Sequence, residues 1–337
     1  MIQYPKLKNH YTIGVTAPSS GIDEHLHNLI HELKSKFNDN HKMIIGDTTF
    51  TQYKAKAGDA KIRGNELKRF LQSTEVDIII PPWGGELAIE VLEYIDYKNI
   101  VPKWIIGYSD ISPILLSITL KTGMATAHGT NLVDLRGKYS DTTTAKWETV
   151  LKTKEKESVI QYSSEHFQSK WDHSKTSEYV FNFDKDTLWK SIGDNNKIKF
   201  EGRILGGCID VIHHLVGTPY GDVKAFRNKF INNEPLIWYL ENCEQSPVEL
   251  RRSLVQMRYA GWFENCNGIM FGRTPVDFDT EGYTIEDVYQ DIANDLNIPI
   301  IYDIDCGHQP PQITFINGSY GVVEYKDGEG TVIQKFI

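Results

Sequence analysis

The chain has 337 residues, of which 40% are hydrophobic and 24% are charged, and its formal net charge is −9. This length is sufficient for two domains with separate hydrophobic cores. The acidic balance excludes a basic face that would bind nucleic acid, and no apolar run approaches the roughly 18 residues of a membrane span.

The N-terminus and the cysteines indicate a cytoplasmic protein. Residues 1–11 are polar and lack the apolar core of a secretory signal. The four cysteines form no C-x-x-C pair and show no zinc-like spacing. We therefore expect free thiols in a reducing cytoplasm, with neither nucleic acid nor a membrane as a partner.

Strands alternate with helices through the first part of the chain. The apolar patterns predict, in order, strand 12–17, helix 23–37, strand 43–45, helix 61–71, strand 76–80 and helix 87–95. The strand at 76–80 is almost continuously apolar, as strands buried on both faces are. The alternation predicts a parallel sheet with helices on both sides.

Residues 104–111, W-I-I-G-Y-S-D-I, predict a buried strand, a sharp turn at Ser109 and a helix. This layout is that of a nucleophile elbow, which lifts a Ser hydroxyl above the sheet edge and aims helix N–H groups at developing negative charge. Ile111 replaces the second Gly of the G-x-S-x-G motif, and a Ser that only caps a helix is the alternative. Ser109 is therefore a candidate nucleophile.

The loop P-P-W-G-G-E at 81–86 directly follows the strand 76–80. Ligands bind at the carboxyl ends of strands in parallel sheets. Gly84 and Gly85 allow close approach of the backbone, and their N–H groups can donate to an anion. We favour this interpretation over a plain turn, because the loop and Ser109 both follow strands of one sheet.

His128 ends an expected strand at 125–128 and is a candidate base on spacing alone, although a structural role is the favoured interpretation. Residues 134–189 are polar and are interpreted as a connection between domains with a long excursion. This segment contains several aromatic residues, including Trp171 and Trp189. An exposed Trp there could stack on a ring of a ligand, and packing against a domain surface is the alternative.

We expect a second domain from about residue 199. Its predicted elements are a strand that enters Gly206-Gly207, helices 209–216, 247–259 and 284–296, and strands 236–240, 268–271 and 299–302. In the tail, Asn-Gly and Asp-Gly turns separate strands 313–316, 320–325 and 331–336, which predicts an antiparallel meander.

Two strand ends of this second domain offer partners for a Ser nucleophile, which needs a base and an orienting carboxylate. Glu241 follows the strand 236–240, and His308 lies in a polar loop after the strand 299–302. Spacing alone does not show that these side chains meet Ser109, and it does not select Glu241 over Glu244.

The chain resembles the LD-carboxypeptidase family of serine peptidases, within it the branch of the microcin C self-immunity proteins. The resemblance covers nearly the whole chain. It rests on six motifs in order: Ala17-Pro18-Ser19-Ser20, Pro82-Trp83-Gly84-Gly85-Glu86, Gly107-Tyr108-Ser109-Asp110, Gly206-Gly207, Leu240-Glu241-Asn242 and Gly307-His308. The second motif has the form of this branch, whereas muropeptide-cleaving members have an Arg-Gly-Gly-Tyr-Gly-like loop.

The resemblance implies a Ser–His–Glu triad. Ser109 would be the nucleophile, His308 the general base and then acid, and Glu241 the carboxylate that orients the imidazole. An oxyanion hole would be formed by the backbone N–H groups of Asp110 and of Gly85 or Gly84.

The resemblance also implies the architecture. We expect an α/β fold with an N-terminal parallel-sheet sandwich that carries the nucleophile elbow (1–165), a connecting excursion over the cleft (166–198), and a C-terminal domain with a small β-barrel that carries Glu and His (199–337). The resemblance further implies a homodimer. No metal and no cofactor are expected.

Substrate contacts are implied for Trp83, Gly84, Glu86, Trp189 and Cys208. In this branch a Trp of the excursion stacks on the nucleobase of the substrate, and Trp189 is the candidate, with core packing as the alternative. Cys208 stands where some members have an Asn that contacts the ligand, which puts amide-type recognition there in doubt.

These features predict a serine carboxypeptidase that hydrolyses the bond between a C-terminal aminoacyl group and a nucleotide-like moiety, through an acyl-enzyme. Processed microcin C and aminoacyl sulfamoyl adenylates are such substrates. The alternative is a muropeptide LD-carboxypeptidase that releases terminal D-Ala in cell-wall recycling. Trp83 weighs against it, because an Arg there would suit a free carboxylate. A binding protein without activity is a third alternative, and the intact Ser, His and Glu argue against it.

Overall fold

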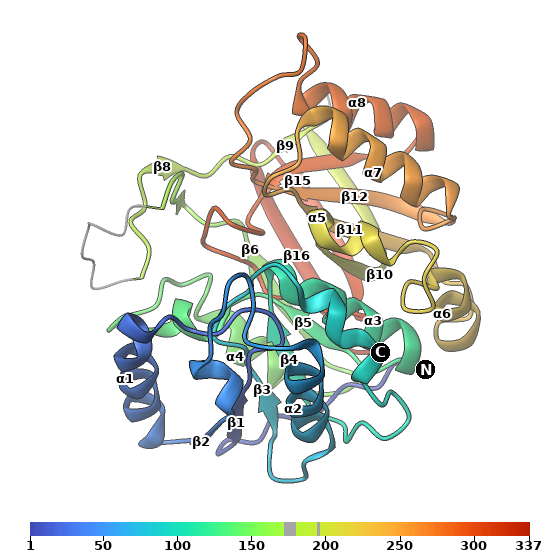
Figure 1. Cartoon of the computed structure of the whole chain (residues 1–337). Helices are drawn as coiled ribbons and strands as arrows, with labels where there is room; N and C mark the ends of the chain where they lie inside the picture. Colours follow the sequence, from blue (N-terminus) through green and yellow to red (C-terminus); the bar gives the residue numbers. More distant parts are fainter. Residues whose placement is uncertain (172–179, 194–195) are drawn as a thin grey trace.

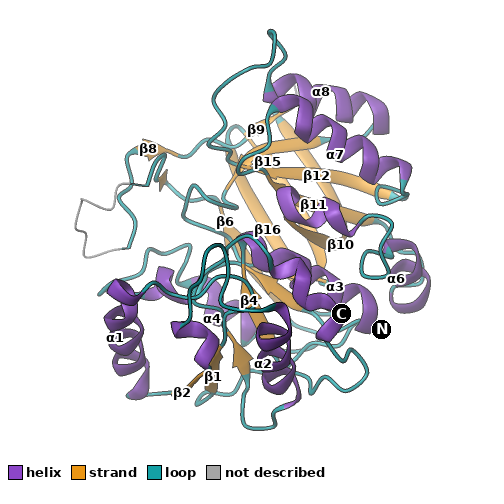
Figure 2. Cartoon of the chain, viewed as in Figure 1, coloured by secondary structure: helices purple, strands orange, loops and turns teal. Residues whose placement is uncertain are grey.

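The computed structural model describes residues 1–171, 180–193 and 196–337, and two β-sheets organise the chain (Figure 1). Apart from one red strand near the C-terminus, the strands of the first sheet are blue to green, whereas most strands of the second sheet are yellow-green to red. Helices cover the sheets, as Figure 2 shows in purple. The mixed α/β class and the parallel N-terminal sheet are confirmed.

The first sheet has six strands in the order β14-β5-β4-β3-β1-β2. All pairs from β2 to β5 are parallel, whereas β14 pairs antiparallel with β5. Its strands are β1 (Thr12–Val15), β2 (Lys42–Ile45), β3 (Ile78–Ile79), β4 (Trp104–Gly107), β5 (Thr126–His128) and β14 (Phe315–Asn317). The carboxyl ends of β3 and β4 therefore lie side by side, which brings the loops after them to one edge.

The helices predicted up to residue 122 form in the expected order, and one further α-helix lies in the segment that was interpreted as a connection. The helices of this half are α1 (His27–Asn38), α2 (Ala60–Gln72), α3 (Ser112–Thr122) and α4 (Lys146–Leu151), with 3-10 helices η1 (Glu24–Leu26), η2 (Asp47–Phe50), η3 (Ala88–Tyr94), η4 (Ser109–Ile111) and η5 (Leu132–Leu135). Every residue of α3 from 112 to 120 is buried. This helix is apolar on all sides because it packs against both halves of the molecule.

The second sheet has eight strands in the order β6-β16-β15-β10-β11-β12-β13-β9. Strands β10 to β13 pair in parallel, and the remaining pairs are antiparallel. The strands are β6 (Ser158–Tyr162), β9 (Lys190–Ser191), β10 (Lys197–Cys208), β11 (Leu236–Glu241), β12 (Cys266–Gly272), β13 (Ile300–Ile304), β15 (Tyr320–Lys326) and β16 (Glu329–Lys335). The resemblance implies a small β-barrel in this domain. In the structure the eight strands form a sheet with two edges, β6 and β9, rather than a closed barrel.

Short helices cover the second sheet, and a two-stranded ribbon extends from it. The helices are α5 (Ile209–Ile212), η6 (His213–Leu215), α6 (Val223–Phe230), α7 (Pro247–Tyr259) and α8 (Ile285–Leu296), and the ribbon pairs β7 (His166–Phe167) with β8 (Lys185–Asp186). A capping box at Ser246 begins α7, and another at Thr284 begins α8.

The structure corrects two expectations about connectivity. The segment 134–189 is not simply a polar connection, because it contains α4 and β6, and β6 pairs with β16. The tail is a hairpin of β15 and β16 rather than a three-stranded meander, because β14 joins β5 of the first sheet. The first sheet thus contains a strand from near the C-terminus, and the second sheet contains a strand, β6, from the middle of the chain.

One hydrophobic core joins the two halves. Ile114 and Leu115 of α3 belong to the same buried cluster as Leu205 of β10 and Trp238 of β11. Shared packing of this kind holds the two sheets in a defined relative position. Side chains from both halves can therefore form one site without a hinge motion.

The four cysteines are free thiols, as expected. No helix in residues 1–171, 180–193 and 196–337 combines the length and the apolar character that crossing a membrane requires.

Candidate active site

Ser109 lies on a strained turn between β4 and α3. Its φ is +59°, in the left-handed region that non-glycine residues rarely adopt. The 3-10 helix η4 begins at Ser109 and continues into α3. This strand–turn–helix geometry is that of a nucleophile elbow, and such backbone strain is typical of functional sites.

His308 joins Ser109 to Glu241. Its Nε2 atom lies 2.9 Å from the Oγ of Ser109, and its Nδ1 atom lies 2.8 Å from the Oε2 of Glu241. A carboxylate only accepts, so we assign the ring proton to Nδ1, and Nε2 then accepts from the Ser109 hydroxyl. The structure thus brings together the three side chains that the sequence placed far apart, in the order of a nucleophile, a base and a carboxylate.

The local backbone explains why Glu241 is the carboxylate in this contact. Glu241 is the last residue of β11 and is buried, whereas Glu244 is exposed, with its backbone N–H donating to Asp210. Gly307 precedes His308 with φ +100°, and a Cβ there would lie 2.0 Å from the Oε2 of Glu241. Only glycine fits this position beside the carboxylate.

Burial and charge set the protonation states of the pair. Burial raises the pKa of Glu241, but the adjacent imidazole rings of His308 and His128 lower it below its ordinary value overall. Burial lowers the pKa of His308, but the Glu241 charge and hydrogen bonds raise it well above 6.5 overall. The arrangement therefore stabilises an imidazolium beside a carboxylate, as a general base requires after it takes a proton.

The loop after β3 approaches the Ser109 side chain closely. A Cβ on Gly84 would lie 2.8 Å from the Cβ of Ser109, 2.9 Å from its Oγ and 3.4 Å from the backbone nitrogen of Asp110. Gly85 has φ +137°. The backbone of this loop and the Asp110 amide thus lie beside the same hydroxyl, where donors to an oxyanion would be needed.

The carboxyl group of Asp110 ties the elbow to this loop. Its Oδ2 accepts a hydrogen bond from the Ser19 hydroxyl and another, of 2.7 Å, from the backbone N–H of Ala88. The backbone N–H of Ser20 donates to the carbonyl of Gly84 at 3.2 Å. Burial raises the pKa of Asp110 to about 6. The side chain of Asp110 is thus a structural clamp that the sequence did not indicate.

Trp83 and Glu86 occupy different environments at the ends of this loop. Trp83 is half-buried, and its Nε1–H donates to the carbonyl of Gly21 at 2.9 Å. Glu86 is largely exposed. The part of its side chain that is shielded from water, together with the charge of Glu244, raises its pKa. Trp83 thus anchors the loop, whereas Glu86 is open to solvent.

The structure supports core packing for Trp189. Its side chain is fully buried, and its Nε1–H donates to Asp305 at 2.9 Å. The prediction that Trp189 stacks on a nucleobase is therefore wrong, because its ring is not accessible to a ligand. Trp171 is 37% exposed instead, and its Nε1–H donates to the backbone carbonyl of His308 at 3.0 Å. The exposed Trp beside the site is Trp171.

Cys208 is also unsuited to the expected ligand contact. Its side chain is buried, and its thiol donates to the carboxylate of Asp210 at 3.3 Å. Asp210 also accepts from the backbone N–H groups of Cys243, Glu244 and Gln245. These bonds position the segment after Glu241, and Cys243 in turn contacts His308. Nothing in the spacing of the sequence indicated Asp210.

His128 lies behind Glu241 and does not contact the Ser109 hydroxyl in the manner of a base. It is fully buried on β5, and its Nε2 lies 3.4 Å from the Oε1 of Glu241. The structural interpretation favoured from the sequence is therefore the better one for His128.

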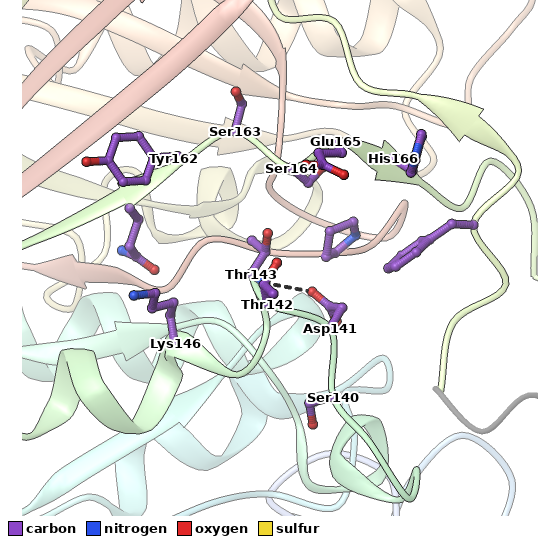
Figure 3. Close-up of a pocket in the computed structure, with 13 residues that line it drawn as sticks. Ser140, Asp141, Thr142, Thr143, Lys146, Tyr162, Ser163, Ser164, Glu165 and His166 are labelled. Atoms are coloured by element: carbon purple, nitrogen blue, oxygen red, sulfur yellow. Dashed lines mark hydrogen bonds between the residues drawn. The ribbon is translucent and has the colours of Figure 1, made fainter.

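A separate cavity of about 540 Å³ lies between two polar segments, 140–146 and 161–166 (Figure 3). In Figure 3, Thr143 and Lys146 come from one side and Ser163 and Ser164 from the other. Asp141 accepts from the backbone N–H of Thr143 at 3.0 Å. Neither Ser109, Glu241 nor His308 lines this cavity, so we place the candidate active site at the three contacting side chains instead.

Comparison with known families and structures identifies the fold. The family model of the LD-carboxypeptidase N-terminal domain matches residues 13–129, and that of the C-terminal domain matches residues 201–322. The chain belongs to the LD-carboxypeptidase family. This family consists of serine carboxypeptidases, which are hydrolases. Ser109 lies in the residues that match the N-terminal model, and Glu241 and His308 lie in those that match the C-terminal model.

Individual relatives in this family are distant in sequence. The microcin C7 self-immunity protein MccF of Escherichia coli is 22% identical over 88% of this chain and 85% of its own length. A Bacillus subtilis relative named "Probable murein peptide carboxypeptidase" is 23% identical over 90% of this chain and 85% of its own length. The solved structure of MccF in complex with aspartyl sulfamoyl adenosine matches over 100% of both chains with a TM-score of 0.81 at 19% identity, which shows a shared fold.

Proposed function

We propose that this LD-carboxypeptidase family member hydrolyses the bond between a C-terminal aminoacyl group and a nucleotide-like moiety, with Ser109 as nucleophile. The contact of Ser109 with His308, and of His308 with Glu241, carries this proposal. A Ser hydroxyl is a weak nucleophile unless an adjacent base takes its proton. Here the base is in hydrogen-bond contact with the hydroxyl, and a buried carboxylate orients it.

The proposed reaction begins with acylation. The Oγ of Ser109 attacks the carbonyl carbon while its proton moves to the Nε2 of His308, and Glu241 stabilises the resulting imidazolium. The negative charge moves to the carbonyl oxygen, which accepts from the backbone N–H of Asp110 and from that of Gly84 or Gly85. His308 then protonates the leaving nitrogen, and the carbon–nitrogen bond breaks to give an acyl-enzyme.

Deacylation reverses the roles of the same groups. His308 takes a proton from water, which attacks the acyl carbon, and the collapse of the second tetrahedral intermediate returns the proton to Ser109. The products are a free carboxylate and the nucleotide-like moiety with the protonated nitrogen; for aspartyl sulfamoyl adenosine this second product is sulfamoyl adenosine. Each step uses side chains that are already in contact in the structure.

Two observations favour a nucleotide-bearing substrate. The loop after β3 has Trp83 where muropeptide-cleaving members have an Arg, and an Arg would suit a free carboxylate. The exposed indole of Trp171 lies beside His308, where it can stack on the nucleobase. MccF, which shares the fold, has a solved structure in complex with aspartyl sulfamoyl adenosine. Glu86, at the open end of the loop, is proposed as a further substrate contact.

The muropeptide alternative is favoured by the Bacillus subtilis relative, whose printed name is that of a murein peptide carboxypeptidase. A paired assay separates the two. The protein is incubated with aspartyl sulfamoyl adenosine and, separately, with a muropeptide tetrapeptide, and products are measured by mass spectrometry with Ser109→Ala as the blank. We expect cleavage of the sulfamoyl adenosine. Cleavage of the tetrapeptide alone would assign the alternative, and cleavage of neither would exclude both.

Assembly and location extend the same family argument. We infer a homodimer that acts in the cytoplasm, from the family resemblance and from the free thiols. Sedimentation analysis tests the dimer, and a single species of about 38.5 kDa would contradict it.

A further inference from the structure

The carboxylate of Glu241 lies between two imidazole rings. One oxygen, Oε2, lies 2.8 Å from the Nδ1 of His308, and the other, Oε1, lies 3.4 Å from the Nε2 of His128. Within the described part of the chain, neither Oε1 nor this Nε2 has a partner in full hydrogen-bond geometry, and both atoms are buried. A buried carboxylate oxygen without a donor is costly, and the His128 ring, which faces Oε1, carries a nitrogen that can donate to it.

The surroundings of His128 exclude solvent. The side chain is 0% exposed, and the rings of Tyr108 and Tyr239 lie 6.4 Å and 5.1 Å from its own ring centre. Its Nδ1 lies 4.0 Å from the Sγ of Cys306. The charged group that faces His128 is therefore Glu241, and the remaining neighbours are a thiol and two aromatic rings.

These contacts select one tautomer of His128. If Nε2 were bare, its lone pair would face the lone pairs of Oε1, and two acceptors would repel each other. With the proton on Nε2, the ring donates to Glu241, and its bare Nδ1 can accept weakly from the Cys306 thiol. Donation then runs in one direction, from Cys306 to His128 and from His128 to Glu241.

We propose that His128 is a positioning residue, which donates to the Oε1 of Glu241 and thereby holds the Oε2 in line with His308. This inference rests on the proposed function, because it assigns His128 a role in the same triad. His128 belongs to the first sheet, and Glu241 belongs to the second. The contact therefore fixes the carboxylate from one half against the half that supplies the nucleophile.

Two polar variants test this role. In His128→Gln the amide nitrogen can reach the place of Nε2, whereas in His128→Asn the shorter side chain ends near the place of Nδ1 and cannot reach Oε1. Loss of a hydrogen bond to a charged group corresponds to a change of about 10- to 100-fold in an equilibrium or rate constant. We expect His128→Asn to lower kcat by about that factor with KM unchanged, and His128→Gln to retain most of the wild-type kcat.

The pH profile gives a readout that a merely structural role would not move. Without the donor, the charge of Glu241 is directed at His308 alone and holds the His308 proton more tightly. The acidic limb of kcat/KM should therefore shift to higher pH in His128→Asn and not in His128→Gln. Two variants with the wild-type profile and rate would overturn the proposal, and so would two variants with equally low rates and an unshifted limb.

A measurement on the unaltered protein does not depend on whether the variants fold. The ¹⁵N resonances of the His128 ring report its tautomer, and we expect a proton on Nε2 and a bare Nδ1. The opposite tautomer would overturn the proposal. Ser109→Ala separates this inference from the proposed function: activity in that variant would refute the triad, whereas an inactive Ser109→Ala beside a fully active His128→Asn would refute only the role of His128.

Discussion

The Nε2 atom of His308 lies 2.9 Å from the Oγ atom of Ser109, although 199 residues separate the two in the chain. Ser109 follows β4 of the first sheet, and His308 follows β13 of the second. The contact depends on the packing of α3 against both halves, because this helix begins beside Ser109 and shares a core with β10 and β11. Substitutions in the core around α3 should therefore change activity even when Ser109, Glu241 and His308 are all retained.

The first prediction concerns pH. His308 must be neutral to accept the Ser109 proton, and its pKa lies above 6.5 because the Glu241 charge outweighs burial. We expect kcat/KM to rise with pH through a midpoint above 6.5. In Glu241→Gln the charge is removed, so the midpoint should fall, and kcat should fall by about 10⁴-fold, as for the equivalent change in Ser–His–Asp enzymes. A pH series from 5 to 9 measures both, and an unchanged midpoint would contradict the assignment of Glu241.

The second prediction compares two glycines with positive φ. In Gly307→Ala the new Cβ would lie 2.0 Å from the Oε2 of Glu241, so we expect the contact between Glu241 and His308 to be displaced and turnover to be lost. Gly217, at φ +79°, has open space around it. Gly217→Ala therefore carries the backbone strain alone, about 1 kcal/mol, and should remain active. Both activity and melting temperature are measured for the two variants. If Gly307→Ala matched Gly217→Ala in both, the close packing described for Gly307 would be contradicted.

The third prediction concerns the clamp formed by Asp110. The pKa of Asp110 is raised to about 6 in the folded protein, so the folded state holds this proton more tightly than the unfolded chain does. This group therefore stabilises the fold at pH 4.5 and loses that contribution as pH rises through 6. The loss between pH 4.5 and 7.5 should be about 2 kcal/mol. Urea unfolding should show this pH-dependent difference between the wild type and Asp110→Asn, and parallel pH dependences would contradict it.

The fourth prediction separates two tryptophans. Trp189 is fully buried, so Trp189→Ala should lower the free energy of unfolding by about 3–5 kcal/mol. Trp171 is partly exposed beside His308, so Trp171→Ala should leave stability nearly unchanged. It should raise KM for aspartyl sulfamoyl adenosine about tenfold, the effect of losing one base–aromatic stack.

Trp171→Phe is the matched control, because it keeps an aromatic face and removes only the indole donor. We expect it to bind the sulfamoyl adenosine more tightly than Trp171→Ala does. Hydrolysis of a small ester without a nucleobase should be insensitive to either change. A rise in KM that is as large for the small ester would indicate that Trp171 acts through the His308 backbone rather than by stacking.

Local patterns in the sequence predicted most of the elements that position the site. Continuous apolar runs and capping signals are local, so β4, α3, β11 and α7 follow directly from them. β6 was missed because it lies in a polar segment and gains its partner, β16, from far along the chain. β14 was misplaced for the same reason, since its partner β5 is nearly 190 residues away.

The site could be predicted only as far as residue types allow. The elbow at Ser109 follows from a strand, a glycine and a helix in sequence, whereas the choice between Glu241 and Glu244 depends on where β11 ends. Counting aromatics in the excursion could not reveal that Trp189 is buried and Trp171 is exposed. Spacing indicated His128 only as a candidate base and did not indicate Asp210 at all, because the contacts of both with their neighbours form only in the folded chain.

The central claim is that the hydroxyl of Ser109 is the nucleophile, and Ser109→Ala tests it most directly. The variant removes one oxygen atom, so its melting temperature and circular dichroism should match those of the wild type. Hydrolysis of aspartyl sulfamoyl adenosine should then fall by at least about 10³-fold, because the alanine side chain has no atom that can attack the carbonyl carbon. Hydrolysis at the wild-type rate by the folded Ser109→Ala protein would contradict the account.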